Sequence, residues 1–208
     1  MKTKEHCIIR YTDLNFDYIG IPKNGSSSFK TSVWLEQKII SESDINWDID
    51  WYKKYKKYLT YISPAQNKLP TVIHFRDPVK RLISTFKDIT QGKKQNIVVN
   101  GIASNGIKNL DYFVDLINDM SEEDRNVHLR SQSWFVKHID DFKNCILFTT
   151  ENFEQGLNKV NQTLNLTLQL YRFNTTDNIT TPAINQQTIS KIEQYYATDF
   201  DLWENSKR

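Results

Sequence analysis

The segment formed by residues 18–40 constrains the fold most strongly, because its pattern is that of a strand, a short polar loop and a helix. The β-favouring apolar run at 18–21 ends at Pro22, and apolar residues then recur at helical spacing. Small loop residues let backbone N–H groups converge on an anion, and the helix dipole points its positive end at the same place. The predicted anion-binding loop consists of Lys23, Asn24, Gly25, Ser26, Ser27 and Ser28.

The order of residues in this loop differs from that of ordinary nucleoside-triphosphate loops. A Walker A loop needs Gly, four residues, Gly, Lys and Ser or Thr, so its lysine stands at the far end. Here Lys23 comes first and no Gly-Lys-Ser follows. A P-loop kinase or nucleotide hydrolase would therefore need a displaced lysine, together with a Mg²⁺ site. The sequence shows no carboxylate cluster with metal-ligand spacing, so we expect no metal.

A second segment, LPTVIHFRDPVKRLISTFKD, carries another pattern suited to anions. Residues 71–75 are predicted to form a buried strand that ends at Arg76, and Asp77 is a good N-cap for the helix that follows. Arg81 and Ser84 are three residues apart and share a face of that helix. Arginine is suited to bidentate recognition of phosphate. Alone, the pattern also fits a helix start with a surface ion pair, but two such segments in one small domain favour an anion site.

These two segments resemble the sulfotransferases that use 3′-phosphoadenosine 5′-phosphosulfate (PAPS). In that superfamily a Pro-Lys-x-Gly-Ser-Thr-Ser loop binds the 5′-phosphosulfate, and an Arg-x-Pro-x-x-Arg-x-x-Ser segment binds the 3′-phosphate. This chain has serine where threonine is usual in the loop, at Ser27. The resemblance implies a set of cofactor-binding residues: Lys23, Asn24, Gly25, Ser26, Ser27, Ser28, Phe29, Arg76 and Ser84.

Later segments resemble the carbohydrate-type, Golgi-like (family 2-like) group of sulfotransferases. They follow one another in the family's order up to about residue 203: VHLRSQSWFV with His128 and Gln132, TTENF with Glu151 and Asn152, and YYATDFDLW with Tyr196, Asp199 and Leu202. The resemblance implies transfer of a sulfuryl group from PAPS to a hydroxyl of a carbohydrate or another small hydroxylated acceptor. The product of the donor would be adenosine 3′,5′-bisphosphate, and Lys23 would stabilise the departing phosphate.

The general base is predicted less directly. His128 is our first choice, because His-x-x-x-Gln on a helix would place His128 and Gln132 on one face. The unperturbed pKa of histidine, about 6.5, also suits proton abstraction close to neutral pH. Relatives often carry a histidine or glutamate between the two cofactor motifs, which makes Glu36 or Glu42 the substitute. His74 shares a strand face with Arg76, but a buried strand histidine is more often structural. A non-catalytic nucleotide- or glycan-binding module stays open as the alternative.

Strands that alternate with helices predict an α/β fold, namely a P-loop-like three-layer fold with a central, mainly parallel sheet flanked by helices. A further strand is predicted at 144–149 and further helices at 110–117, 153–166 and 185–196. A chain of 208 residues is long enough for one sizeable core, so we expect a single domain over 1–208.

Two stretches allow alternative interpretations. The lysine- and tyrosine-rich stretch at 50–62 has helical spacing, and we expect either a solvated amphipathic helix or a basic platform for an anionic acceptor such as a glycan. The stretch at 91–109 is rich in Gly and Asn, and we expect a mobile loop or a small hairpin over the site.

Charge and hydropathy exclude several classes of partner. A net charge of +2 gives no general attraction to nucleic acid. The sequence has no run of about 18 apolar residues that could span a bilayer and no signal-peptide core at its start, so we expect a cytoplasmic protein of microbial or viral origin. Its two cysteines, Cys7 and Cys145, are expected to be free thiols.

Overall fold

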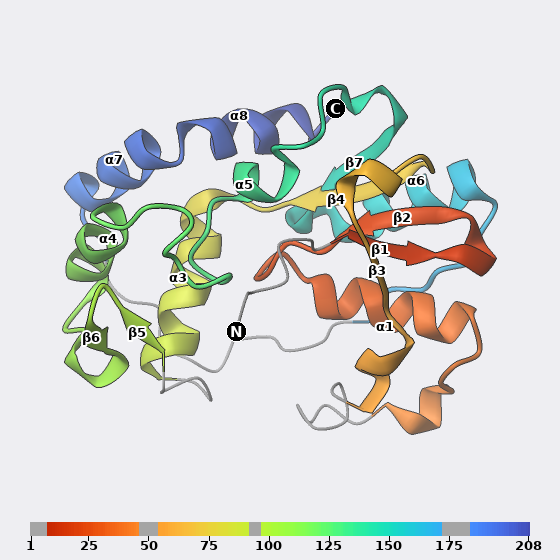
Figure 1. Cartoon of the computed structure of the whole chain (residues 1–208), viewed down its shortest axis with the longest axis horizontal. Helices are drawn as coiled ribbons and strands as arrows, with labels where there is room; N and C mark the ends of the chain where they lie inside the picture. Colours follow the sequence, from red (N-terminus) through yellow and green to blue (C-terminus); the bar gives the residue numbers. More distant parts are fainter. Residues whose placement is uncertain (1–7, 46–53, 92–96, 172–183) are drawn as a thin grey trace.

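The computed structural model describes residues 8–45, 54–91, 97–171 and 184–208. Its centre is a five-stranded sheet with the order β3-β1-β2-β4-β7 (Figure 1). These strands are β1 (Ile8–Tyr11), β2 (Phe16–Ile19), β3 (Thr60–Ile62), β4 (Thr71–Phe75) and β7 (Cys145–Thr149). β1 is antiparallel to β2 and β3, whereas β2, β4 and β7 pair in parallel, so all strands except β1 point the same way.

The central strands are buried along their whole length. Every residue of β2 and β4 is buried, as is typical of parallel strands that are covered on both faces. The strand predicted at 71–75 is confirmed at those bounds. The strands predicted at 18–21 and 144–149 are also present, although the first begins and ends two residues earlier.

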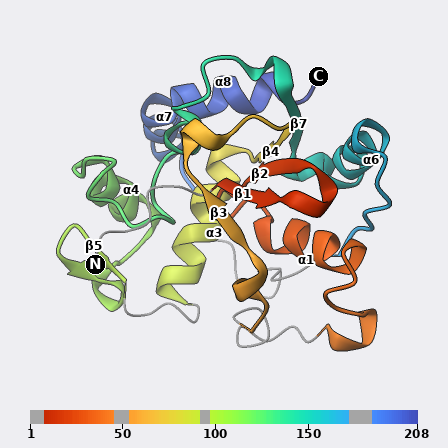
Figure 2. The ribbon, with the colours of Figure 1, turned by 45° about the vertical axis from the view of Figure 1, so that its right-hand side comes forward.

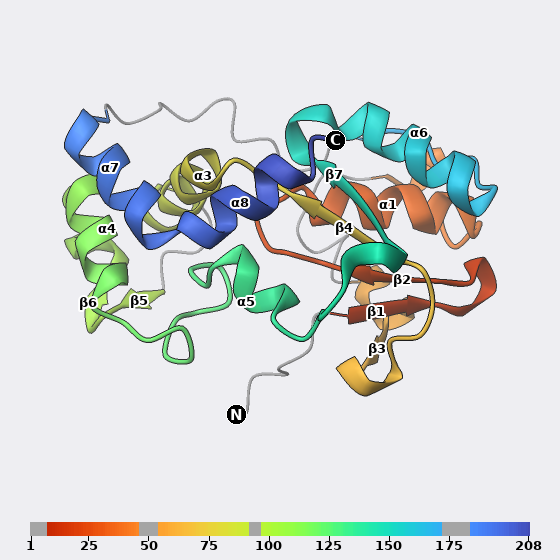
Figure 3. The ribbon, with the colours of Figure 1, turned by 90° about the horizontal axis from the view of Figure 1, so that it is seen from above.

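Helices cover both faces of the sheet. On one face, α1 (Ser26–Glu36) and α6 (Phe153–Leu164) form a core with β2 and β7. On the other face, α5 (Gln132–Val136) and α8 (Ala197–Asn205) pack against β2 and β4. Figure 3 shows α1 and α6 on one side of the strands. The predicted α/β fold with a central, mainly parallel sheet flanked by helices is thereby confirmed.

A second apolar core lies beside the sheet, away from α6 (Figure 2). It is formed by three helices and a small hairpin: α3 (Pro78–Thr90), α4 (Leu110–Asn118), α7 (Gln186–Tyr195), β5 (Val98–Val99) and β6 (Ile102–Ala103). The helices predicted at 110–117, 153–166 and 185–196 are therefore confirmed, the last as α7. The hairpin expected within 91–109 is also present in the described part of that stretch.

The helix predicted over 50–62 is present at Lys54 and Tyr55, the first described residues of this stretch, but it does not continue to residue 62. Residues Lys56–Tyr58 form a short 3₁₀ turn, and Thr60–Ile62 is the edge strand β3. The local spacing was helical, but the β-favouring Thr-Tyr-Ile run pairs with β1 and so satisfies its backbone groups. Thr60 pairs with Arg10, which pairs with Asp17 at the start of β2, whereas the predicted anion loop follows the end of β2. The described part of the proposed basic platform thus lies at the end of the sheet where β2 begins, away from the predicted anion loop. Residues 50–53 lie outside the described residues.

None of the helices in the described part of the chain is long and apolar enough to cross a membrane. Among the same residues, Cys145 is a free thiol, whereas Cys7 lies outside them.

Candidate active site

The candidate site lies at the edge of the sheet where the parallel strands β2, β4 and β7 end, which is the usual place for ligands in such sheets. Lys23 and Asn24 follow β2, Arg76 follows β4, and Thr150 follows β7. Arg76 Nη1 donates to the Lys23 carbonyl oxygen at 2.7 Å, and Thr150 Oγ1 donates to that of Asn24 at 2.8 Å. The two segments predicted to bind anions therefore meet in the structure.

The loop after β2 turns through two left-handed residues. Lys23 has φ 70° and Gly25 has φ 82°, a region that favours glycine. Gly25 is also the N-cap of α1, and a Cβ atom there would lie 3.3 Å from the Phe153 ring. The serines at 26–28 form the first turn of α1, where backbone N–H groups have no partner within the helix. Phe29 sends its ring into the core, where it stacks on Tyr18, so Phe29 can face an anion only with its backbone.

A fully buried glutamine joins this loop to β4. Gln132 Oε1 accepts hydrogen bonds from Asn24 Nδ2 at 2.6 Å and from the Arg76 backbone N–H at 2.9 Å. Gln132 Nε2 donates to the Arg76 carbonyl oxygen at 2.8 Å. Asn24 Nδ2 also donates to the carbonyl oxygen of His74 at 2.9 Å. One side chain thereby fixes the position of the loop relative to the end of β4.

The start of α5 is held in turn by a buried carboxylate on α8. Asp199 accepts hydrogen bonds from the backbone N–H groups of Gln132 and Ser133, at 2.7 and 2.8 Å. Burial raises the pKa of Asp199, and the charge of Arg81 and the backbone donors partly offset this shift. Arg81 is itself buried, which lowers its pKa, and its Nε donates to the Pro22 carbonyl oxygen at 3.1 Å. Arg81 thus holds the backbone of Pro22, the residue before the loop, with a hydrogen bond from α3.

The side chain of Lys23 reaches across to α3. Lys23 Nζ lies 2.7 Å from Asp88 Oδ2, and the two side chains are only 16% and 19% exposed. Ser84 lies one helical turn before Asp88, so the two residues share a face of α3.

The predicted start of α3 is confirmed, because the Asp77 carboxylate accepts from the first-turn N–H groups of the helix.

The structure places His128 differently from the prediction. His128 lies in a turn before α5, and α5 begins only at Gln132, because the Ser131 hydroxyl caps it by accepting from Trp134 N–H. The shared helix face of His128 and Gln132 is therefore wrong. The backbone of His128 contacts α3, since its carbonyl oxygen accepts from Oγ1 of Thr85, the residue after Ser84, at 3.3 Å.

Glu36 is not brought together with Lys23. It is the last residue of α1, and ten residues of helix after Ser26 correspond to about 15 Å. Its carboxylate accepts from the backbone N–H and the hydroxyl of Thr167, at 3.2 and 2.7 Å. Glu42, the other substitute base, accepts from the Tyr171 hydroxyl, and Glu36 and Glu42 both line a cavity beside the end of α1.

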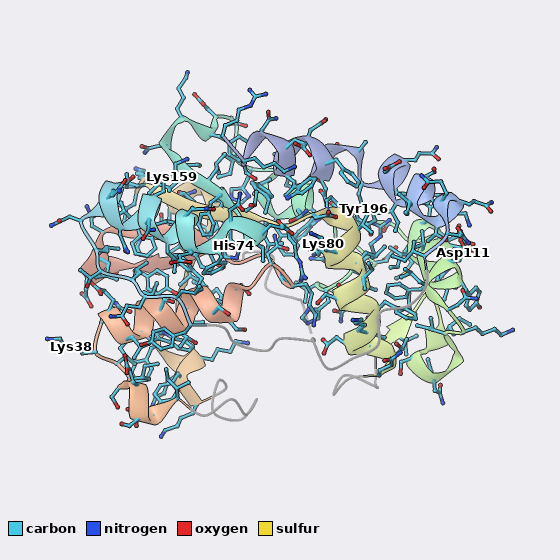
Figure 4. All side chains as sticks on the ribbon, turned by 180° about the vertical axis from the view of Figure 1, so that it is seen from behind. Lys38, His74, Lys80, Asp111, Lys159 and Tyr196 are labelled. Carbon is cyan, nitrogen blue, oxygen red and sulfur yellow. The ribbon has the colours of Figure 1, made fainter. Side chains whose placement is uncertain are left out.

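His74 lies among aromatic rings within the sheet half of the molecule (Figure 4). Its ring is 5.7 Å from that of Tyr18, 5.0 Å from that of Phe148 and 5.3 Å from that of Phe153. Neither ring nitrogen has a hydrogen-bond partner among the residues that the structure describes. Burial lowers the pKa of His74 to about 3, so the ring is neutral, which agrees with the structural role expected for it.

The later family-like segments gather around the same edge. Glu151 accepts from the backbone N–H of Asp77 at 3.3 Å and from Trp203 Nε1 at 3.1 Å, which joins the end of β7 to α3 and α8. Tyr196 is buried beside α3, and burial raises its pKa to about 12. The roles of Gln132 and Asp199 were not predicted from the residues, and only the order of the family-like segments had drawn attention to them.

Comparison with known proteins identifies the family of the chain. The model of the Sulfotransferase family matches residues 6–204, so the chain belongs to that family. No curated protein and no solved structure matches the chain. Family membership assigns to it the class of transferases that move sulfuryl groups. Within the described residues, no group of three or more histidine, cysteine, aspartate or glutamate side chains is arranged to hold a metal ion.

Replacement of Gln132 tests its bridging role. We expect Gln132→Met to lower the free energy of unfolding by about 2–4 kcal/mol, because buried groups of Asn24 and Arg76 lose their partner. Urea unfolding of the variant would measure this loss. Gln194→Met, on the exposed face of α7, is the control and should unfold like the wild type. An equal midpoint for both variants would show that the bridge adds nothing.

The buried His74 predicts a pH dependence of stability. Its folded pKa, about 3, lies below the usual value, so the unfolded state binds the extra proton as pH falls below about 6.5. His74 should therefore contribute a loss of about 2 kcal/mol in the free energy of unfolding between pH 7 and pH 5. His74→Phe should remove this part of the loss, whereas His128→Gln should keep it. A loss in His74→Phe as large as in the wild type would contradict the assignment.

Proposed function

We propose that the protein transfers the sulfuryl group of PAPS to a hydroxyl of a carbohydrate acceptor. The observation that carries this proposal is the direct contact between the two anion-binding segments. Arg76 at the end of β4 donates to the backbone of Lys23 in the loop after β2. Two cations at adjacent strand ends suit a ligand that carries anionic groups at two separate places. The family match supports the reaction class.

The residues of the site fit the two anionic groups of PAPS. Lys23 and the first-turn amides of Ser26, Ser27 and Ser28 form a phosphate-binding loop for the 5′-phosphosulfate. Arg76 and Ser84 hold the 3′-phosphate, while Asn24, Gly25 and Phe29 act through the shape of the loop. The continuous match over 6–204 supports one sulfotransferase domain over the whole chain.

The donor, when bound, supplies the sulfuryl group and leaves as adenosine 3′,5′-bisphosphate. Lys23 places a full positive charge where negative charge grows on the departing phosphate oxygen, and the helix N-terminus adds partial positive charge. As in phosphoryl transfer, positioning and charge stabilisation provide most of the catalysis. The proton of the acceptor hydroxyl passes to a general base, and this scheme assigns no step to a metal ion.

We further propose His128 as that base, in preference to Glu36. The backbone of His128 contacts Thr85, the neighbour of Ser84 on α3, whereas the Glu36 carboxylate binds Thr167 at the far end of α1. A non-catalytic nucleotide- or glycan-binding module is the second candidate, because the contacts at the loop would bind a nucleotide even without a base.

The donor class can be tested by calorimetric titration with adenosine 3′,5′-bisphosphate, ADP and ATP, with and without Mg²⁺. We expect a preference for the 3′-phosphorylated nucleotide without metal, and loss of this preference in Arg76→Ala. Lys143→Ala is the matched control, since it removes a positive charge at the start of β7, at the opposite edge of the sheet. A preference for ATP with Mg²⁺ would instead support a kinase or nucleotide hydrolase.

The base is tested by sulfuryl transfer from PAPS to a panel of carbohydrate acceptors. We expect His128→Ala to lower kcat by about 10²–10⁴-fold, with little change in the affinity for adenosine 3′,5′-bisphosphate. Glu36→Ala, the control, should keep its turnover. Turnover that survives both substitutions would refute His128 as the base, and a wild type that binds the nucleotide but transfers to no acceptor would favour the binding module.

A further inference from the structure

Asp88 on α3 is a charged residue at the loop that the proposed reaction does not use. Its Oδ2 atom lies 2.7 Å from Lys23 Nζ. Both side chains are largely shielded from water, in contrast to the surface pair of Lys143 with Asp141, whose side chains are 89% and 55% exposed. The Coulomb attraction within a shielded ion pair is stronger than within an exposed one, because water and salt screen it less.

The backbone of Lys23 is fixed, whereas its amine can move. The residue is held at φ 70°, and its carbonyl oxygen accepts from Arg76 Nη1. The four-carbon side chain can still rotate between alternative partners for the amine. In the structure the amine rests against α3, one helical turn beyond Ser84.

This pair competes with the function proposed for Lys23. The amine cannot place its full charge on a donor oxygen while Asp88 neutralises it, and the Asp88 carboxylate would repel anionic groups bound nearby. We propose that Asp88 is a positioning residue that holds the Lys23 amine on α3 in the empty enzyme and yields it to the 5′ group of the bound nucleotide. This inference rests on the proposed function of the loop.

The competition has a consequence for ligand selection. An anion that uses the Lys23 amine must first displace Asp88 from it. The apparent affinity of the anion is therefore reduced in proportion to the fraction of molecules in which the pair is broken. A nucleotide with a 3′-phosphate offsets that cost through Arg76 and Ser84, whereas inorganic pyrophosphate has no such contacts. Asp88 therefore lowers the affinity of the loop for both kinds of ligand by a similar factor, and only the nucleotide still binds tightly, through its additional 3′-phosphate contacts.

The test compares Asp88→Asn with the wild type in titrations with adenosine 3′,5′-bisphosphate and with inorganic pyrophosphate. We expect Asp88→Asn to bind the nucleotide about 3- to 10-fold more tightly and to gain at least as much for pyrophosphate. Asp141→Asn is the matched control, since it breaks an exposed lysine–aspartate pair at the other edge of the sheet, and should change neither affinity. Thermal unfolding confirms that each variant is folded.

A double-mutant cycle with Lys23→Ala separates the pair from a general charge effect. In the Lys23→Ala background, Asp88→Asn should tighten nucleotide binding by less than half of its effect, on a logarithmic scale, in the wild type. Equal tightening in both backgrounds would mean that Asp88 acts through bulk charge, and would overturn the inference. A fall in kcat of more than about 10²-fold with unchanged binding would also overturn it, because Asp88 would then act at the acceptor.

Acylation of the Lys23 amine by acetic anhydride, followed by peptide mass analysis, reports on the pair without any nucleotide. We expect faster acylation of Lys23 in Asp88→Asn than in the wild type, and the wild-type rate in Asp141→Asn. An unchanged rate in Asp88→Asn would overturn the role of Asp88 even if nucleotides bind as proposed. A wild type that binds no 3′-phosphorylated nucleotide would instead overturn the proposed function, and with it the use of this pair.

Discussion

The buried amide of Gln132 is the interaction on which the candidate site depends. It is contributed by α5, yet it binds the loop after β2 and both backbone groups of Arg76 after β4. Gln132 and Asn24 are fully buried and Arg76 is partly buried, so these groups would carry a desolvation cost without their partners. A helix as short as α5 does not fix its own position, and Asp199 of α8 does so by binding its first two N–H groups. The geometry of the loop is thus set by residues far away in the sequence.

This framework positions the two cationic side chains of the site, Arg76 and Lys23, and each of them interacts with an acceptor within the protein. Arg76 donates to the carbonyl oxygen of Lys23, and the Lys23 amine pairs with Asp88. A third cation, Arg81, donates a hydrogen bond to the carbonyl oxygen of Pro22, just before the loop. An incoming anion therefore exchanges existing contacts for new ones, and its affinity reflects the difference between the two sets.

Local sequence was sufficient where local interactions decide the structure. The strand at 71–75, the cap at Asp77 and the helix after Gly25 were all predicted, because apolar periodicity and capping act over a few residues. The loop residues were likewise recognisable from their order around Lys23. The strand β3 was missed, because its apolar spacing was helical and only its pairing with β1 decides otherwise.

The candidate base shows the limit of such reasoning more sharply. The spacing of His128 and Gln132 fitted one helix, but Ser131, a favoured N-cap residue three positions after His128, starts the helix there instead, and this local signal was not used in the prediction. The partners of Gln132 lie 108 and 56 residues away, and that of Glu36 lies 131 residues away. Such contacts depend on the whole topology and could not be predicted from spacing.

The ligand proposed for the site would account for the position of Lys23 at the start of its loop. A triphosphate presents contiguous charges, which one glycine-rich loop, its terminal lysine and a metal ion can cover. A nucleotide with separate 3′ and 5′ anionic groups needs cations at two places that are held at a fixed distance. Adjacent parallel strands, about 4.8 Å apart, provide those places at their ends. With the lysine first, its carbonyl oxygen accepts from Arg76 while its amine pairs with Asp88, so one residue joins the two strand ends to α3 and, in the proposed reaction, its amine would turn to the reacting group.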